Sequence, residues 1–111
     1  PLRADVPEAV ALARRAGIVV AMITGDYPAT ALAIAAQAGI DTGPGALTGP
    51  EIARLGSEAL RERVRTVRVY ARVMPEQKLA LVEAMKADGQ VVAMTGDGVN
   101  DAPALEAAHI G

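Results

Sequence analysis

The chain has 111 residues and a mass of 11.4 kDa, a length that fits one domain and not two. Hydrophobic residues make up 51% and charged residues 22% of the sequence, a composition that excludes a disordered chain. The net charge is −2, and the longest basic block is the pair Arg14-Arg15, so nucleic-acid binding is disfavoured. Two tyrosines, with no Phe or Trp, argue against a platform for stacked nucleobases.

Several kinds of functional site are excluded by residue types that are scarce. The chain has no cysteine, so it has no disulfide, no thiolate nucleophile and no Cys-based zinc site. A single histidine, His109, cannot form a His-rich metal site or a Ser-His-Asp triad. The longest strongly apolar run, residues 17–23, is far shorter than the roughly 20 residues that span a bilayer, and no secretory signal opens the chain. We therefore expect a soluble, reduced protein.

Helices and buried strands alternate along the chain. The apolar run at 18–23 is typical of a strand buried on both faces, and the helix at 28–38, nearly all Ala, Leu and Ile, is expected to be buried. Ser57 is the expected N-cap of its helix. We predict helices at 7–16, 28–38, 50–55, 57–66 and 75–88, a loop at 41–49, strands at 18–23, 67–71 and 91–94, a last short helix capped by Asn100 or Asp101, and the start of a further strand at Ile110-Gly111. This alternation predicts a parallel sheet with right-handed crossovers.

Two of the predicted strands share a sequence. Residues 19–22 and 91–94 are identical, and both run into Thr-Gly-Asp within two residues. Two similar strands can arise by chance in a chain rich in Ala and Val. The interpretation we favour is that two strand ends bring a hydroxyl, a bare backbone amide and a carboxylate to one point, because ligands bind at the carboxyl ends of such strands.

The first strand ends in Thr24-Gly25-Asp26, which offers a hydroxyl and a glycine amide that a ligand can approach closely. The free N–H groups of the following helix complete a possible anion-binding turn. The same three residue types also form ordinary strand-to-helix turns. Alone, this tripeptide is therefore weak evidence for a phosphate site.

A more specific pattern follows the last predicted strand. Asp97 and Asp101 lie four residues apart around a glycine and Asn100, the only asparagine of the chain. Such oxygen ligands suit Mg²⁺. The alternative is that Asp101 only caps a helix and Asp97 only occupies a turn, which leaves two acids on one tight loop unexplained.

Lys78 lies in the first turn of its predicted helix, where the helix dipole disfavours a cation by roughly 0.3–1 kcal/mol. Leu81, Val82 and Met85 follow at helical spacing, so Lys78 begins the apolar face, whereas Lys86 belongs to a solvated face. A lysine at a buried edge needs an anion such as a phosphate, unless it simply extends into solvent. Together with the Thr-Gly-Asp turn and the acidic loop, Lys78 supplies the groups needed for phosphoryl transfer by positioning and charge neutralisation. No residue stands out as the nucleophile.

The sequence resembles the P-type cation-transporting ATPases at several places in the family's order. T-G-D-G-V-N-D-A-P-A-L at 95–105 matches the family's hinge signature, Y-A-R-V-M-P-E-Q-K at 70–78 resembles its aromatic-A-R-V-x-P-E-x-K segment, and M-I-T-G-D at 22–26 resembles its T-G-D motif. Pro1-Leu2-Arg3 is similar to the end of its D-P-x-R motif. The resemblance covers the whole chain and is closer to the calcium-pump-like branch than to the heavy-metal branch.

The resemblance implies an α/β fold, a three-layer Rossmann-like parallel sheet of the haloacid-dehalogenase superfamily. Residues 1–111 would form a single partial phosphorylation domain, its carboxyl-terminal half. The D-K-T-G-T motif with the phosphorylated aspartate is absent. In the family it ends a central strand between those at 18–23 and 91–94, so we expect that strand to be missing. The unpaired edges would then invite self-association. His109 stands where the family usually has Asp, as a surface substitution.

The resemblance also implies a role for each candidate residue. Thr24 and Gly25 would hold the transferred phosphoryl group, Lys78 would neutralise its charge, and Asn100 would bond its oxygens. Asp97 would ligate Mg²⁺, and Asp101 would support the metal and contact Lys78. Asp26 and Arg72 would face the nucleotide. The catalytic residues would be Thr24, Lys78 and Asp101.

The implied function is the Mg²⁺-dependent phosphoryl-transfer part of an ATP-driven cation pump, on the cytoplasmic side of an integral membrane protein. Its partners would be the pump's own nucleotide-binding, actuator and membrane domains, and this chain alone would be inactive. The alternatives are a fragment of a soluble haloacid-dehalogenase-type phosphatase and a non-enzymatic module that binds Mg²⁺ or a nucleotide. The chain opens with Pro1 and stops where a strand is expected to begin, so we expect it to be part of a longer protein.

Overall fold

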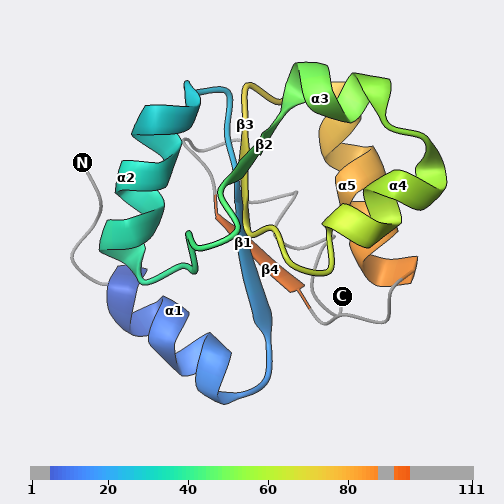
Figure 1. Cartoon of the computed structure of the whole chain (residues 1–111). Helices are drawn as coiled ribbons and strands as arrows, with labels where there is room; N and C mark the ends of the chain where they lie inside the picture. Colours follow the sequence, from blue (N-terminus) through green and yellow to red (C-terminus); the bar gives the residue numbers. More distant parts are fainter. Residues whose placement is uncertain (1–5, 88–91, 96–111) are drawn as a thin grey trace.

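A computed structural model of the chain describes residues 6–87 and 92–95 (Figure 1). Its four strands form one parallel sheet in the order β2-β3-β1-β4. Among the described residues, no helix has the length and apolar character needed to cross a membrane. The elements, in chain order, are α1 (Val6–Arg15), β1 (Val19–Ile23), α2 (Pro28–Ala38), β2 (Ala46–Thr48), α3 (Gly49–Arg54), α4 (Ser57–Arg63), β3 (Val69–Ala71), α5 (Pro75–Ala87) and β4 (Val92–Thr95).

The sheet lies between two layers of helices, with α1 and α2 on one side and α3, α4 and α5 on the other (Figure 1). Successive residues of a strand point to opposite faces, so β1 supplies both cores. Ala21 and Ile23 pack with the side of α3, α4 and α5, whereas Val20 and Met22 pack with the side of α1 and α2. The predicted three-layer α/β fold is confirmed.

Glycines end the helices on the α1–α2 side. Gly17 and Gly39 both adopt the left-handed conformation, with φ of +82° and +85°. The Gly39 N–H donates to the carbonyls of Ala35 and Ala36, which closes the end of α2. The predicted bounds of α1, α2 and α5 agree with the structure to within one residue at each end that is described.

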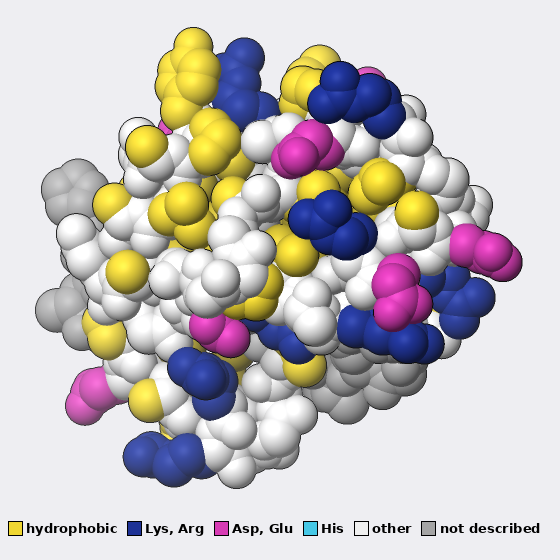
Figure 2. Space-filling model, in the orientation of Figure 1, with side chains coloured by type: hydrophobic (Ala, Val, Ile, Leu, Met, Phe, Trp, Pro, Cys, Tyr) yellow, Lys and Arg dark blue, Asp and Glu magenta, His cyan; other side chains and the backbone are white. Residues whose placement is uncertain are grey.

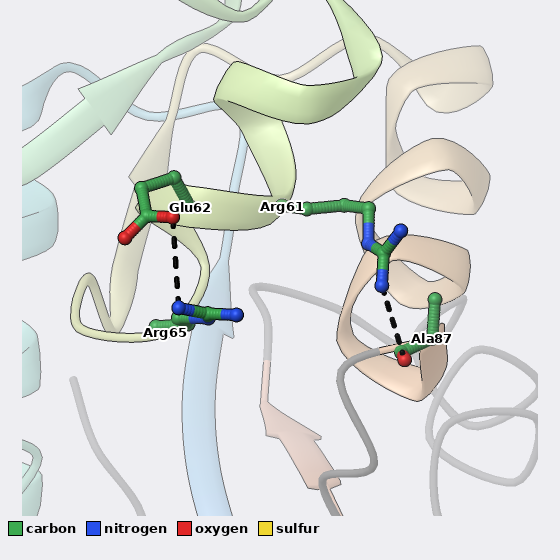
Figure 3. A network of polar contacts seen from close by, with 4 residues as sticks. All are labelled: Arg61, Glu62, Arg65 and Ala87. Atoms are coloured by element: carbon green, nitrogen blue, oxygen red, sulfur yellow. Dashed lines mark hydrogen bonds and ion pairs between the residues drawn. The ribbon is translucent and has the colours of Figure 1, made fainter.

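The helices on the other side are joined by polar contacts on the surface (Figure 3). The guanidinium of Arg61 on α4 donates to the Ala87 carbonyl at the end of α5 over 3.5 Å. Next to it, Arg65 and Glu62 form an ion pair at 3.6 Å, with both side chains more than half exposed. An exposed pair of this kind adds little stability. The buried apolar side chains therefore hold α4 against α5.

One strand lies where a loop was predicted. The expected loop at 41–49 contains β2, which pairs in parallel with β3, with Leu47 opposite Tyr70. Both of these side chains are fully buried. The loop prediction was wrong for these three residues because the strand is short and is defined by its pairing with a distant segment.

Two further predictions on the helices were wrong. Ser57 is the first residue of α4 rather than its N-cap; Gly56 takes the cap position, without a side-chain hydrogen bond. In α2 only one face is buried, at Ala31, Ala35 and Ala38. Leu32 and Ile34 are half-buried beside this face, and the apolar side chains that α2 exposes are alanines.

The two strands of shared sequence are direct neighbours. Val19 pairs with Val92 and Met22 pairs with Thr95, so β1 and β4 run in parallel side by side. The structure thus has no gap between them of the kind expected from the absent family strand; instead β4 covers the edge of β1. The predicted last helix, the strand start at Ile110-Gly111, His109 and the first three residues lie outside the described residues.

Candidate active site

Two loops run together at the carboxyl edge of the sheet, one after β1 and one after β3. The Thr24 N–H donates to the Tyr70 carbonyl over 2.9 Å, and the Val73 N–H donates to the Thr24 carbonyl over 3.1 Å. The Arg72 N–H donates to the Asp26 carbonyl over 3.0 Å. Backbone hydrogen bonds therefore hold the Thr-Gly-Asp turn against the Ala-Arg-Val segment, which brings Thr24, Gly25, Asp26 and Arg72 to one place.

The turn itself combines a buried hydroxyl with an open amide. Thr24 is 2% exposed, and its Oγ1 accepts a hydrogen bond from the Asp26 N–H over 3.1 Å. Asp26 is half-buried, whereas Gly25 is exposed. A Cβ added at Gly25 would meet no atom within 4 Å, and its φ is not in the left-handed region. Neither packing nor backbone conformation therefore requires glycine at this position.

Lys78 lies at the same edge because α5 follows β3. Its N–H donates to the Met74 carbonyl over 3.2 Å in the first turn of the helix, and its side chain is half-buried. Leu81, Val82 and Met85 are buried, so Lys78 begins the apolar face of α5 as predicted. Lys86, in contrast, is exposed in the last turn.

Arg72 has an unusual backbone and a defined side-chain contact. Its φ is +55°, a left-handed conformation that costs an L residue about 1–2 kcal/mol. Its guanidinium carbon lies 4.6 Å from the centre of the Tyr27 ring. On the face of the molecule drawn in Figure 2, basic, acidic and apolar side chains are interspersed.

Sequence reasoning missed Gly49 and Gln77, which support the loop after β3. A Cβ at Gly49 would overlap the Arg72 carbonyl oxygen. The Gln77 Nε2 donates to the Gly49 carbonyl over 2.9 Å, while its Oε1 accepts the Met74 N–H over 2.9 Å. The T-x-x-E pattern at 48–51, a capping box, is the sequence signal that could have marked this junction.

The expected metal ligands follow β4. Thr95 at the end of β4 pairs with Met22, so the two strands finish at the same edge. Asp97, Asn100 and Asp101 lie outside the described residues. Within 6–87 and 92–95 no group of three or more acidic or histidine side chains could hold a metal ion. Two carboxylates and an amide after a strand that ends beside Met22, two residues before Thr24, are a donor set that fits Mg²⁺.

An open pocket lies at the opposite edge of the sheet, and we assign it no chemistry. Its lining residues are Arg14, Gly17, Ile18, Val19, Val20, Asp41 and Arg68. The Arg14 guanidinium donates to the Gly39 carbonyl over 2.7 Å, and that of Arg68 donates to the carbonyls of Val64, Arg65 and Val67. Both guanidinium groups thus donate hydrogen bonds to backbone carbonyls at the ends of helices and turns.

The chain is similar to known proteins along nearly its whole length. A family model described as haloacid dehalogenase-like hydrolase matches residues 1–109. The chain is 56% identical over 116 residues to the probable cation-transporting ATPase F of Mycobacterium tuberculosis, and 51% identical over 112 residues to calcium-transporting ATPase 1 of Lactococcus lactis. It is 46% identical over 114 residues to calcium-transporting ATPase 1 of Yarrowia lipolytica.

Each of these alignments covers the whole chain but only 12–13% of the relative's length. The predicted resemblance to P-type cation-transporting ATPases is confirmed along the whole chain. The relatives are named as cation- or calcium-transporting ATPases, and this sequence matches one short segment of each.

Proposed function

Because the chain belongs to the haloacid dehalogenase-like hydrolase family, we propose that it provides part of the phosphorylation domain of an ATP-driven cation pump. Residues 1–111 would act as one partial domain that supports Mg²⁺-dependent phosphoryl transfer. The observation that carries this proposal is the turn with buried Thr24 and open Gly25 at the edge where α5 begins with Lys78. The 51% identity to a calcium-transporting ATPase supports the pump as the context.

In this proposal each described residue acts by position and charge. The Thr24 hydroxyl and the Gly25 amide donate to phosphoryl oxygens, and the Lys78 ammonium offsets their negative charge. Asp26 and Arg72 face the nucleotide that donates the phosphoryl group. Arg72 is suited to this contact because a guanidinium remains charged at all physiological pH values.

The loop after β4 would complete the site. Asp97 and Asp101 would hold Mg²⁺, Asn100 would bond phosphoryl oxygens, and Asp101 would also contact Lys78. A bound Mg²⁺ supplies further neutralisation of phosphoryl charge. The phosphorylated aspartate would come from the remainder of the pump, together with its nucleotide-binding, actuator and membrane domains. We therefore propose that this chain alone does not hydrolyse ATP, and that it works on the cytoplasmic side of the membrane.

A hybrid pump tests this function directly. Residues 1–111 replace the matching segment of calcium-transporting ATPase 1 of Lactococcus lactis, and Ca²⁺-dependent ATP hydrolysis and formation of the acid-stable phosphoenzyme are measured. We expect the hybrid to be active, and Lys78→Ala to lower phosphoenzyme formation by about 100-fold or more.

Lys86→Ala is the matched control, since it removes the other lysine of the chain from the exposed end of the same helix. It should leave the hybrid active. A folded hybrid in which both lysine variants form the phosphoenzyme equally well would contradict the proposed role of Lys78. Hydrolysis of ATP by the 111-residue chain alone would contradict the need for a partner segment and favour the soluble phosphatase.

A further inference from the structure

The choice of tyrosine at position 27 is not explained by the core or by helix capping. Tyr27 is 67% exposed, while the other tyrosine, Tyr70, is fully buried. Tyr27 is the N-cap of α2, a position that favours Ser, Thr, Asp or Asn, and its side chain makes no capping hydrogen bond. A large exposed aromatic at a cap position therefore needs another reason.

The backbone of Arg72 is fixed from three directions. Its N–H donates to the Asp26 carbonyl over 3.0 Å, its carbonyl oxygen packs against Gly49, and its φ of +55° turns the chain away from β3. The side chain consequently leaves a backbone that is held in place. These backbone contacts do not fix the direction of the exposed Arg72 guanidinium.

The Tyr27 ring is placed to set that direction. The guanidinium carbon lies 4.6 Å from the ring centre, within the range of a cation–π contact. Within the part of the chain that the structure describes, no carboxylate forms an ion pair with Arg72. The Asp26 carbonyl links the two residues through the backbone, so ring and guanidinium meet over the loop that carries Thr24 and Gly25.

We propose that Tyr27 is a positioning residue: its ring holds the Arg72 guanidinium at the carboxyl edge of the sheet, ready for the nucleotide. This inference rests on the proposed function for the identity of the ligand. A guanidinium held in one place loses less rotamer freedom when it meets a nucleotide, so the contact should appear in the affinity for ATP and not in the phosphoryl-transfer step.

The test uses the hybrid pump and separates KM for ATP from kcat. Tyr27→Leu keeps a large apolar side chain but has no π face, and should raise KM by about two- to fivefold with kcat unchanged. Tyr27→Phe retains the ring and should restore the original KM. As a control, Leu12→Ala shortens an exposed apolar side chain on α1 and should change neither KM nor kcat. In an Arg72→Ala background, Tyr27→Leu should have no further effect.

The outcomes separate this inference from the function on which it rests. If Arg72→Ala leaves KM unchanged, the proposed nucleotide contact of Arg72 is wrong. If Arg72→Ala raises KM while Tyr27→Leu does not, the positioning role of Tyr27 is overturned and the function stands.

If the hybrid is inactive, the function fails and NMR of the 111-residue chain decides the inference alone. The Arg72 side-chain protons should show a ring-current shift that Tyr27→Leu abolishes and Tyr27→Phe keeps. Identical Arg72 shifts in all three proteins would overturn the positioning role.

Discussion

Two glycines at the carboxyl edge have opposite surroundings, although both follow a threonine. Gly49 packs against the Arg72 carbonyl and lies beside the Gln77 side chain, whereas Gly25 faces open space. Gly49 is therefore required by packing between segments far apart in the sequence. Gly25 is required, in our proposal, only by the ligand.

Alanine at each position should consequently produce different losses. Gly49→Ala forces a methyl group into the Arg72 carbonyl, and we expect it to lower the free energy of unfolding by about 3 kcal/mol. Gly25→Ala should change that free energy by less than about 0.5 kcal/mol yet strongly lower phosphoenzyme formation in the hybrid pump. Urea denaturation and phosphoenzyme assays check the pair. Equal stability losses would contradict this division between packing and ligand contact.

The sequence identified some of these residues and missed others for a physical reason. Thr24 and Lys78 lie in local motifs, and the structure gives both the burial that the motifs suggest. Gly49, Gln77 and Tyr27 owe their importance to contacts across the β1, β2 and β3 ends; the capping box at 48–51 marks the start of α3, but no local pattern encodes the contacts themselves. Asp97, Asn100 and Asp101 stay predictions.

Among the elements, α3 is the one fixed most clearly by its own N-terminal residues. The Thr48 N–H donates to the Glu51 Oε1 over 2.9 Å, the Thr48 hydroxyl donates to the same oxygen over 3.0 Å, and the Glu51 N–H donates back to the hydroxyl over 3.4 Å. These bonds lower the pKa of Glu51, the backbone bond most strongly, with further help from Arg63 and Arg54. The capping box also orients Gly49, the first residue of α3.

The lowered pKa gives this cap a predictable pH dependence. The ionised Glu51 contributes fully above its ordinary pKa of 4.5, and the contribution is lost as pH falls through the lowered pKa of the folded state. At pH 7 we expect the free energy of unfolding of wild type to exceed that of Glu51→Gln by at most about 0.5 kcal/mol. The difference is small because the carboxylate is partly exposed. The difference should shrink as the pH falls below 4.5 and vanish in acid once the folded protein also binds this proton.

Urea unfolding of both proteins at pH 7 and in acid checks this expectation. Thr48→Ala serves as control, because it removes the capping hydroxyl and should cost about 1 kcal/mol even where Glu51 is protonated. A difference between wild type and Glu51→Gln that grows on acidification would show that the cap does not favour the ionised carboxylate.

The strength of local signals also explains which elements could be predicted. Pro28 and Gly39 bracket α2, and the apolar run before Thr24 is long enough to mark β1, so both were found. β2 has three residues in a region rich in Gly and Pro, and its buried Leu47 has meaning only beside β3. Short strands of this kind depend on tertiary pairing more than on propensity.

At the scale of the whole molecule, the pairing of β1 with β4 is the feature that differs most from expectation. The family resemblance places a strand ending in D-K-T-G-T between them, and in this chain they pair directly, Val20 beside Ala93. The three-layer packing is retained because the helices on both faces pack against β1 and β3 in the two apolar cores. The parallel arrangement was therefore predictable, whereas the pairing at this junction and the edge strand β2 were not.

A peptide that carries the absent strand should compete for this junction. We expect a peptide ending in D-K-T-G-T to insert beside β1 and to remove the amide NOEs between β1 and β4, while those between β1 and β3 persist. Two-dimensional NMR of the labelled chain with increasing peptide checks this, with a scrambled peptide as control. Persistent β1–β4 NOEs at saturating peptide would contradict insertion.

The same pairing has a consequence for how the protein is made. β1 is translated well before its partner β4, which follows only after everything from α2 to α5. At a translation rate of roughly 5–20 residues per second, β4 is synthesised on the order of several seconds after β1. Until then β4 cannot pair with that edge of β1. In this interval the edge of β1 that β4 later covers is open to pairing with another chain, so synthesis exposes a surface for strand exchange that the folded sheet hides.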